Sequence, residues 1–118
     1  MPKPQVLIVA RDANIASLME SLVEVAGYRP AHPAADERPL AALARLRPDV
    51  LLLDCDHSLA TSDATQITAR DAGSRVVLFS AAHPAWELER FAQRRGLRSI
   101  ALPAAPAAIG RAIADAIG

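Results

Sequence analysis

The chain has 118 residues, 52% of them hydrophobic but only 3% aromatic, and its 13 basic and 13 acidic side chains cancel. This length predicts one domain over residues 1–118, with a core of Ala, Leu, Ile and Val. The basic residues form no stripe and no apolar run is long enough to span a membrane, so we expect neither nucleic acid nor membrane as a partner. One cysteine and a short polar start that does not resemble a signal peptide favour a soluble, cytoplasmic protein.

The first two elements are a buried strand and an amphipathic helix. Residues 6–9 form an uninterrupted apolar run, which is typical of a parallel strand covered on both faces. Apolar residues then recur on one helical face over residues 15–26. Asp12 or Asn14 can cap the start of this helix, and Gly27 can end it.

The next two elements are an edge strand and a short helix. Residues 28–33 are extended but contain two prolines, which lack the N–H that a central strand donates, so this strand belongs at a sheet edge. Asp36 can cap a helix that has Pro39 in its first turn. Pro48 closes that helix.

The stretch from Pro48 to Ser58 carries the strongest functional signal. Residues 50–53 predict a central strand, and Asp54 follows where that strand leaves the sheet. Ligands of open α/β sheets bind outside the carboxyl ends of the strands, so Asp54 is a candidate site residue. The alternative is that Asp54 only starts the following turn.

The second half of the chain continues the alternation of strands and helices. It predicts a short helix within residues 61–72, a strand over 75–80 and a helix that begins at Pro84 and stops at Gly96. The apolar residues of that helix are Trp86, Leu88, Phe91 and Ala92. A strand over 99–102 and a final helix to the chain end follow. Strict alternation implies an α/β fold, a doubly wound parallel sheet with helices on both faces. The edge strand makes the flavodoxin-like order 2-1-3-4-5 the natural solution.

At this point the sequence resembles the receiver domain of bacterial two-component response regulators, over essentially the whole chain. Pro-Asp-Val-Leu-Leu-Leu-Asp, residues 48–54, matches the third strand of that family and places Asp54 at its phosphoacceptor position. Ser80 falls where the family has a hydroxyl that contacts the phosphoryl group, and Leu102-Pro103 falls where it has a Lys-Pro pair. The resemblance implies the flavodoxin-like (βα)5 fold and a role in phosphorelay signalling.

The pocket chemistry departs from that family at several positions. The family has a pair of acids after its first strand that holds a divalent cation, whereas this chain has Ala10 and Arg11, with Asp12 one place later. Leu102 stands in place of the family's lysine, and Ser99 in place of its aromatic switch residue. We therefore expect Asp12 to cap the first helix rather than to bind a metal.

The charge balance around Asp54 leaves two arrangements open. The guanidinium of Arg11 could form a bidentate pair with Asp54 and mask it, or it could point into solvent. We expect no metal and no other cofactor, because Asp54 with the Asp56 carbonyl is a poor site for Mg²⁺. If Mg²⁺ binds, its ligands would come from Asp12, Asp54 and Asp56.

The remaining polar residues give weaker signals. His32, His57 and His83 are scattered, so we expect no catalytic or metal role for them, and Cys55 alternates away from Asp54 as a small core residue. In the receiver family the fourth helix belongs to the output surface, which makes a basic patch there a candidate interaction face, although such a patch is usually only solvated. The candidates for this face are Arg94, Arg95, Arg98, Ser99, Ile109 and Ile113.

The sequence favours a pseudo-receiver: a non-enzymatic receiver domain that acts by protein–protein interaction, with little or no phosphorylation. Its partners would be a histidine kinase, an output domain, another regulator or a second copy of the chain. The alternative is a phosphorylation-competent receiver in which Asp54 accepts phosphate from a histidine kinase with Mg²⁺. A flavodoxin-like enzyme or flavin module is the third hypothesis, and the lack of a glycine-rich phosphate loop argues against it.

Overall fold

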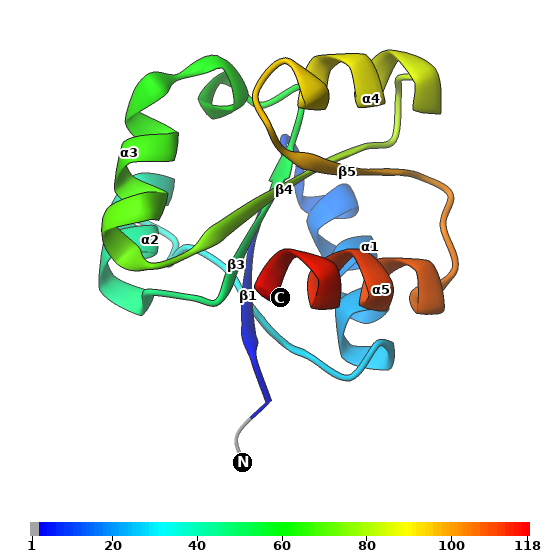
Figure 1. The fold of residues 1–118 in the computed structure, drawn as a ribbon. Coiled ribbons are helices and arrows are strands. Elements are labelled where there is room, and N and C mark those ends of the chain that lie inside the picture. Colours follow the sequence, from blue (N-terminus) through cyan, green and yellow to red (C-terminus); the bar gives the residue numbers. More distant parts are fainter. Residues whose placement is uncertain (1–2) are drawn as a thin grey trace.

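The fold is built on a parallel β-sheet with helices on both faces (Figure 1). The structure is a computed structural model that describes residues 3–118. Its strands are β1 (Gln5–Val9), β2 (Arg29–Ala31), β3 (Val50–Asp54), β4 (Arg75–Ser80) and β5 (Arg98–Ala101). They pair in the order β2-β1-β3-β4-β5, all parallel, which confirms the predicted flavodoxin-like topology.

Five α-helices and one short 3-10 helix connect the strands. They are α1 (Ala13–Val25), α2 (Pro39–Leu46), η1 (Ser58–Thr61), α3 (Asp63–Ala72), α4 (Ala85–Gln93) and α5 (Pro106–Ile117). Helices α1 and α5 cover one face of the sheet, and α2, α3 and α4 cover the other (Figure 1). No helix within residues 3–118 is both long enough and apolar enough to cross a membrane.

Strands β1 and β3 are buried on both faces, which explains their continuous apolar sequence. Alternate side chains of each strand point to opposite layers of the core. The layer under α2, α3 and α4 receives Leu7, Val9, Leu51, Leu53 and Leu78. The layer under α1 and α5 receives Val6, Ile8, Val50, Leu52, Val77 and Phe79. Asp54 continues this alternation at the end of β3, where the core ends and the loops begin.

The ends of the first two helices confirm one predicted cap and correct another. Asp12 caps α1: its Oδ1 accepts a hydrogen bond from the Ile15 N–H at 2.9 Å. Gly27 follows the C-terminal end of α1 with a φ of 97°, a conformation that glycine adopts without steric cost. Asp36 does not cap α2, because Arg38 holds the N-cap position and makes no side-chain cap bond.

The burial of helix side chains shows one prediction to be wrong, the placing of Ile109 and Ile113 on an interaction face. Trp86 is 64% exposed on α4, while Leu88, two residues later, is buried. Ile109 and Ile113 of α5 are 0% exposed, so they belong to the core beside α1 and cannot form part of a surface for partners. In each case the side of the helix that faces the sheet decides which apolar residues are covered.

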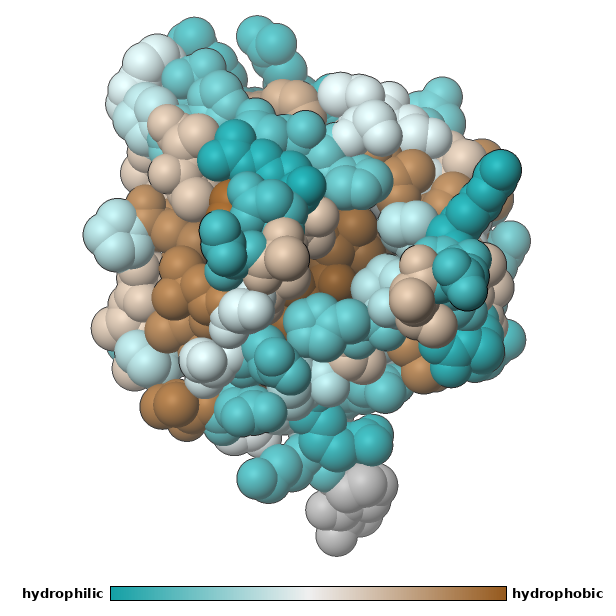
Figure 2. All heavy atoms as spheres, turned by 180° about the vertical axis from the view of Figure 1, so that it is seen from behind, coloured by the Kyte–Doolittle hydropathy of each residue, from teal (hydrophilic) through white to brown (hydrophobic). Residues whose placement is uncertain are grey.

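Large apolar side chains that remain exposed are spread over several helices. Within residues 3–118 they are Leu18, Val25, Ile67, Trp86 and Ile117, which lie on α1, α3, α4 and α5. Figure 2 shows the side of the molecule opposite to the view of Figure 1, with apolar groups at its centre and left among hydrophilic ones. The exposed apolar residues are therefore distributed over helices on both sides of the sheet and do not gather on one helix.

Candidate functional site

The site lies at the carboxyl edge of the sheet, where Asp54 ends β3. We use the name Asp54 pocket for Asp54 and the residues that follow the strands at this edge of the sheet: Arg11, Cys55, Asp56, Ser80, His83 and Leu102. The Asp54 carboxylate is 1% exposed and accepts two backbone hydrogen bonds, from the Arg11 N–H at 3.1 Å and from the Asp56 N–H at 3.0 Å. The loops after β1 and β3 therefore hold both carboxylate oxygens.

The Arg11 side chain does not pair with Asp54, so the masking pair, one of the two arrangements that the sequence left open, is not formed. Its Nη1 lies 3.5 Å from Asp56 Oδ2, and its Nε lies 3.8 Å from Asp12 Oδ2. The backbone N–H of Arg11 donates to Asp54, while its guanidinium lies between the carboxylates of Asp12 and Asp56. Arg11 thus contributes an amide to Asp54 and a charge to Asp56.

Asp56 is bridged to the loop after β4 by His83, which the sequence did not single out. The two side chains meet at 2.7 Å, between His83 Nε2 and Asp56 Oδ1. The other ring nitrogen of His83, Nδ1, lies 3.4 Å from Glu87 Oε1. The hydrogen bond to Asp56 raises the pKa of His83 above its usual value, and the Asp56 charge acts in the same direction.

Ser80 is fully buried at the end of β4 and organises that same loop. Its Oγ accepts hydrogen bonds from the Ala82 N–H at 3.1 Å and the His83 N–H at 2.9 Å. Cys55 lies beside it and is half-buried at the edge of the core, which refines the prediction of a core cysteine. Burial raises the pKa of the Cys55 thiol, while hydrogen bonding with Ser80 acts in the opposite direction.

Leu102 follows β5 at the same edge of the sheet and places an apolar group there. Its backbone N–H donates to the Ser80 carbonyl at 2.8 Å, and its side chain packs against the core layer under α1 and α5. Because that side chain carries no charge, this side of the pocket offers no cation to an anionic ligand.

The metal-binding potential of the pocket lies beside Asp54 rather than on it. Within residues 3–118, the one group of three or more potential metal-ligating side chains is Cys55, Asp56 and His83, whose ligand atoms lie within 4.8 Å of one another. Asp54 is outside this group, and so is Asp12, which caps α1. The oxygen-rich set of Asp12, Asp54 and Asp56 is therefore not assembled as a group.

The three arginines of the predicted interaction face differ in their contacts and in their exposure to solvent. Arg95 follows the end of α4 and is tied back to that helix, with its guanidinium 3.7 Å from the centre of the Phe91 ring and Nη1 donating to the Phe91 carbonyl. Arg98 is exposed and lies 4.0 Å from Asp115, and Arg94 is exposed at the end of α4. Of these three arginines, Arg94 and Arg98 are thus the exposed ones.

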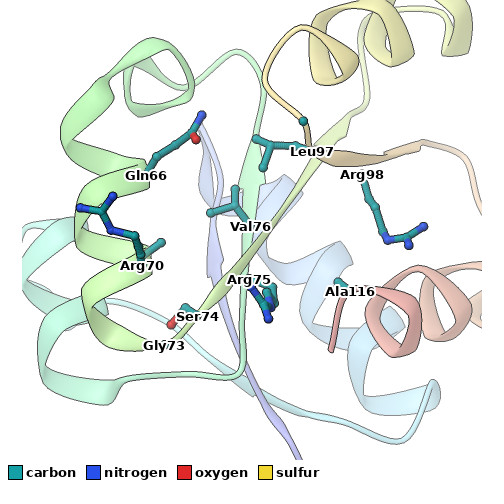
Figure 3. Close-up of a pocket in the computed structure, with 11 residues that line it drawn as sticks. Gln66, Arg70, Gly73, Ser74, Arg75, Val76, Leu97, Arg98 and Ala116 are labelled. Atoms are coloured by element: carbon teal, nitrogen blue, oxygen red, sulfur yellow. The ribbon is translucent and has the colours of Figure 1, made fainter. Parts of the chain in front are cut away.

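A cavity of about 380 Å³ lies elsewhere, at the opposite end of β4 from Asp54. Its lining comes from α3, β4, β5 and α5, and includes Arg70, Arg75 and Arg98 (Figure 3). The Arg70 and Arg98 side chains point apart, and each has an acidic neighbour, Asp71 at 3.9 Å and Asp115 at 4.0 Å. These arginines do not converge, so the cavity is a weak candidate for an anion site.

Comparison with solved structures identifies the fold. A signal receiver domain of a modulated diguanylate cyclase from Desulfovibrio desulfuricans superposes with a TM-score of 0.75 at 23% identity, covering 98% of this chain and 94% of the other. The chain has the receiver-domain fold. A response regulator receiver protein from Burkholderia phymatum gives a TM-score of 0.71 at 23% identity, with 98% and 96% covered.

The receiver fold is also shared with more distant sequences. A chemotaxis protein from Vibrio cholerae gives a TM-score of 0.71 at 15% identity, covering 97% of this chain and 98% of the other. The sequence matches no protein-family model and no curated protein closely enough to count as a relative. The likeness to receivers is therefore carried by the three-dimensional structure and not by overall sequence identity.

Proposed function

We propose that this chain is a pseudo-receiver of two-component signalling, a non-enzymatic domain that acts by protein–protein interaction with little or no phosphorylation of Asp54. The receiver fold supports the signalling class. The chemistry of the Asp54 pocket supports the loss of phosphorylation. The chain would meet its partners in the cytoplasm.

The observation that carries this proposal is the isolation of the Asp54 carboxylate. Transfer of a phosphoryl group to an aspartate needs a nucleophilic carboxylate, a cation on the phosphoryl oxygens and a second positive group that holds the product. Here both oxygens of Asp54 accept backbone amides, Asp12 serves as a helix cap, and Leu102 offers no charge. Because the Asp56 carboxylate is engaged by His83 and Arg11, Mg²⁺ would find only the Asp54 carboxylate, with little to compensate for its lost water.

The partner surface that fits this proposal is formed by α4, β5 and the exposed side of α5. Arg94, Arg98 and Ser99 are at least partly exposed there, and Trp86 adds a large exposed aromatic side chain on α4. Aromatic residues and arginines are enriched in protein interfaces. A histidine kinase, an output domain, another regulator or a second copy of this chain would dock on this surface.

Incubation with acetyl phosphate and Mg²⁺, followed by intact-mass measurement, tests the proposal. We expect no phosphoryl adduct on the wild-type chain. The control is Asp54→Ala under the same conditions. A stable adduct on the wild type that is lost in Asp54→Ala would overturn the pseudo-receiver proposal in favour of a phosphorylation-competent receiver.

A second measurement asks whether the receiver switch operates. Beryllofluoride mimics the phosphoryl group, so light scattering with and without it compares the assembly state of the two forms. We expect no change, because Ser99 has no ring that could report an altered pocket and a ligand shifts an equilibrium only by its differential affinity for the two states. A change of assembly on adding beryllofluoride would contradict the proposal.

A further inference from the structure

We propose that Cys55, Asp56 and His83 form a binding site for a divalent transition-metal ion of the Zn²⁺ class. The ligand atoms are Cys55 Sγ, one Asp56 carboxylate oxygen and His83 Nε2. Asp54 is not one of the ligands, so metal binding can be measured on the unphosphorylated chain. The ion would join the loop after β3 to the loop after β4 through a thiolate, a carboxylate and an imidazole.

The topology brings the three ligands together. Cys55 and Asp56 follow β3 directly, and His83 lies three residues after the end of β4. Strands β3 and β4 pair side by side and in parallel, so their following loops meet at the same edge of the sheet. The Cys55 N–H, which donates to the Phe79 carbonyl at 2.9 Å, fixes the first of these loops to β4.

The distances suit a small tetrahedral ion. The three ligand atoms lie within 4.8 Å of one another, and the closest approach is 2.7 Å between Asp56 and His83. Zinc bonds of about 2.0–2.3 Å in tetrahedral geometry separate ligand atoms by about 3.3–3.7 Å. Binding therefore needs shifts of about 1 Å. All three residues are at least partly exposed, so their side chains can make these shifts without disturbing the core.

The donor set selects the kind of metal. A thiolate, an imidazole and a carboxylate are the ligands that Zn²⁺ takes in proteins, whereas Mg²⁺ prefers oxygen ligands and retains its water. The exposure of Asp56 leaves the fourth position open to a water molecule. Negative charge from the Cys55 thiolate and from Asp56 would balance the ion, and Arg11 approaches the other carboxylate oxygen, Asp56 Oδ2.

A second layer of contacts orients the ligands. Metal-binding histidines usually give their other ring N–H to a carboxylate, and His83 Nδ1 has Glu87 Oε1 at 3.4 Å. The Ser80 hydroxyl accepts the His83 backbone N–H and also hydrogen-bonds the Cys55 side chain. Glu87 is thus a positioning residue, and Ser80 connects both loops.

Metal binding would fix the beginning of α4. His83 precedes Pro84, the N-cap residue of α4, and Glu87 lies in the first turn of that helix. An ion that ties His83 to Cys55 and Asp56 would hold this end of α4 against β3. Because α4 carries part of the proposed partner surface, the ion would make that surface more rigid.

The test titrates Co²⁺ and Zn²⁺ into the full chain after removal of metals with a chelator. We expect one ion per chain, a thiolate-to-Co²⁺ charge-transfer band, and displacement of Co²⁺ by Zn²⁺ but not by Mg²⁺. Cys55→Ser should abolish the charge-transfer band, and Cys55→Ser and His83→Gln should each weaken Zn²⁺ binding at least about tenfold. Glu87→Gln should keep the Co²⁺ spectrum, because every ligand remains, but bind about tenfold more weakly.

The matched control is His32→Gln. His32 also faces a carboxylate, Glu20 at 3.6 Å, but lies outside the ligand group, so this variant should bind Zn²⁺ like the wild type. Circular dichroism of the metal-free variants checks that each is folded, and Asp56→Asn provides a further ligand variant if one of them is not. Absence of a charge-transfer band in the wild type, or Zn²⁺ affinity that survives both Cys55→Ser and His83→Gln, would overturn the proposal. Neither result depends on the acetyl phosphate experiment, so the two proposals fail separately.

Discussion

Replacing Asp54 by alanine tests whether the buried carboxylate stabilises the fold, as its two backbone contacts suggest. The change removes the acceptor for the N–H groups of Arg11 and Asp56. A hydrogen bond to a charged group contributes about 1.5–3 kcal/mol, so two contribute about 3–6 kcal/mol. Relief of the buried charge and hydration of the freed amides offset part of this loss. We expect the free energy of unfolding to fall by about 2 kcal/mol.

Asp49→Ala is the matched control. Asp49 is an exposed aspartate that directly precedes β3, at the opposite end of the strand from Asp54. Its Oδ2 accepts one backbone hydrogen bond, from the Gln5 N–H at 2.8 Å. Exposed groups regain water easily, so this change should cost about 1 kcal/mol or less. For a domain of this size, the melting temperature should fall by about 8 °C in Asp54→Ala and by about 4 °C or less in the control.

Urea unfolding followed by circular dichroism measures the difference. This signal is preferable to fluorescence, since Trp86 is largely exposed in the folded state. The dependence of the unfolding free energy on urea should be equal for the variants, which would show that only stability has changed. A chain that is as stable or more stable after Asp54→Ala would refute the reasoning. The carboxylate would then cost stability, as expected for a residue retained for phosphoryl chemistry.

Two other predictions concern the core and a surface ion pair. Ile113→Ala should lower the free energy of unfolding by about 2–5 kcal/mol, whereas Ile117→Ala, at a side chain 40% exposed, should cost far less in the same urea experiment; equal losses would contradict the assigned burial. Hydrogen bonds from Arg45 lower the pKa of Glu37 from 4.5 to about 2, so its stabilising contribution should be present above about pH 4.5 and be lost as the pH falls toward 2. An NMR titration should show this low pKa and its return toward 4.5 in Arg45→Gln, and an unchanged pKa in that variant would exclude the pair as its cause.

The sheet was predictable from the sequence because its physical causes are local. Continuous apolar runs mark strands that are covered on both faces, and these runs gave β1, β3 and β4. Prolines placed β2 at an edge, and strict alternation with helices then leaves few possible topologies. The positions of Asp54 and Ser80 at one edge followed from the same argument.

The details of the Asp54 pocket were not predictable because they depend on loop paths. Whether Arg11 presents its amide or its guanidinium to Asp54 is decided by the direction of the chain after β1. His83 lies in a loop that follows a strand, and the shared edge of parallel strands was the one signal that could have drawn attention to it. The burial of Ile109 and Ile113, by contrast, could have been predicted, because an apolar helical stripe is normally the buried one.

The short edge strand β2 also affects whether copies of this chain can aggregate by strand pairing at high concentration. The Arg29 N–H donates inward, to the Pro4 carbonyl at 3.0 Å, so the next residue, Pro30, directs its backbone away from the sheet. Proline has no N–H, and an incoming strand would therefore find an acceptor but no donor at the middle of a three-residue edge. Strand-by-strand aggregation through this edge is blocked by covalent structure, independently of charge, pH or salt.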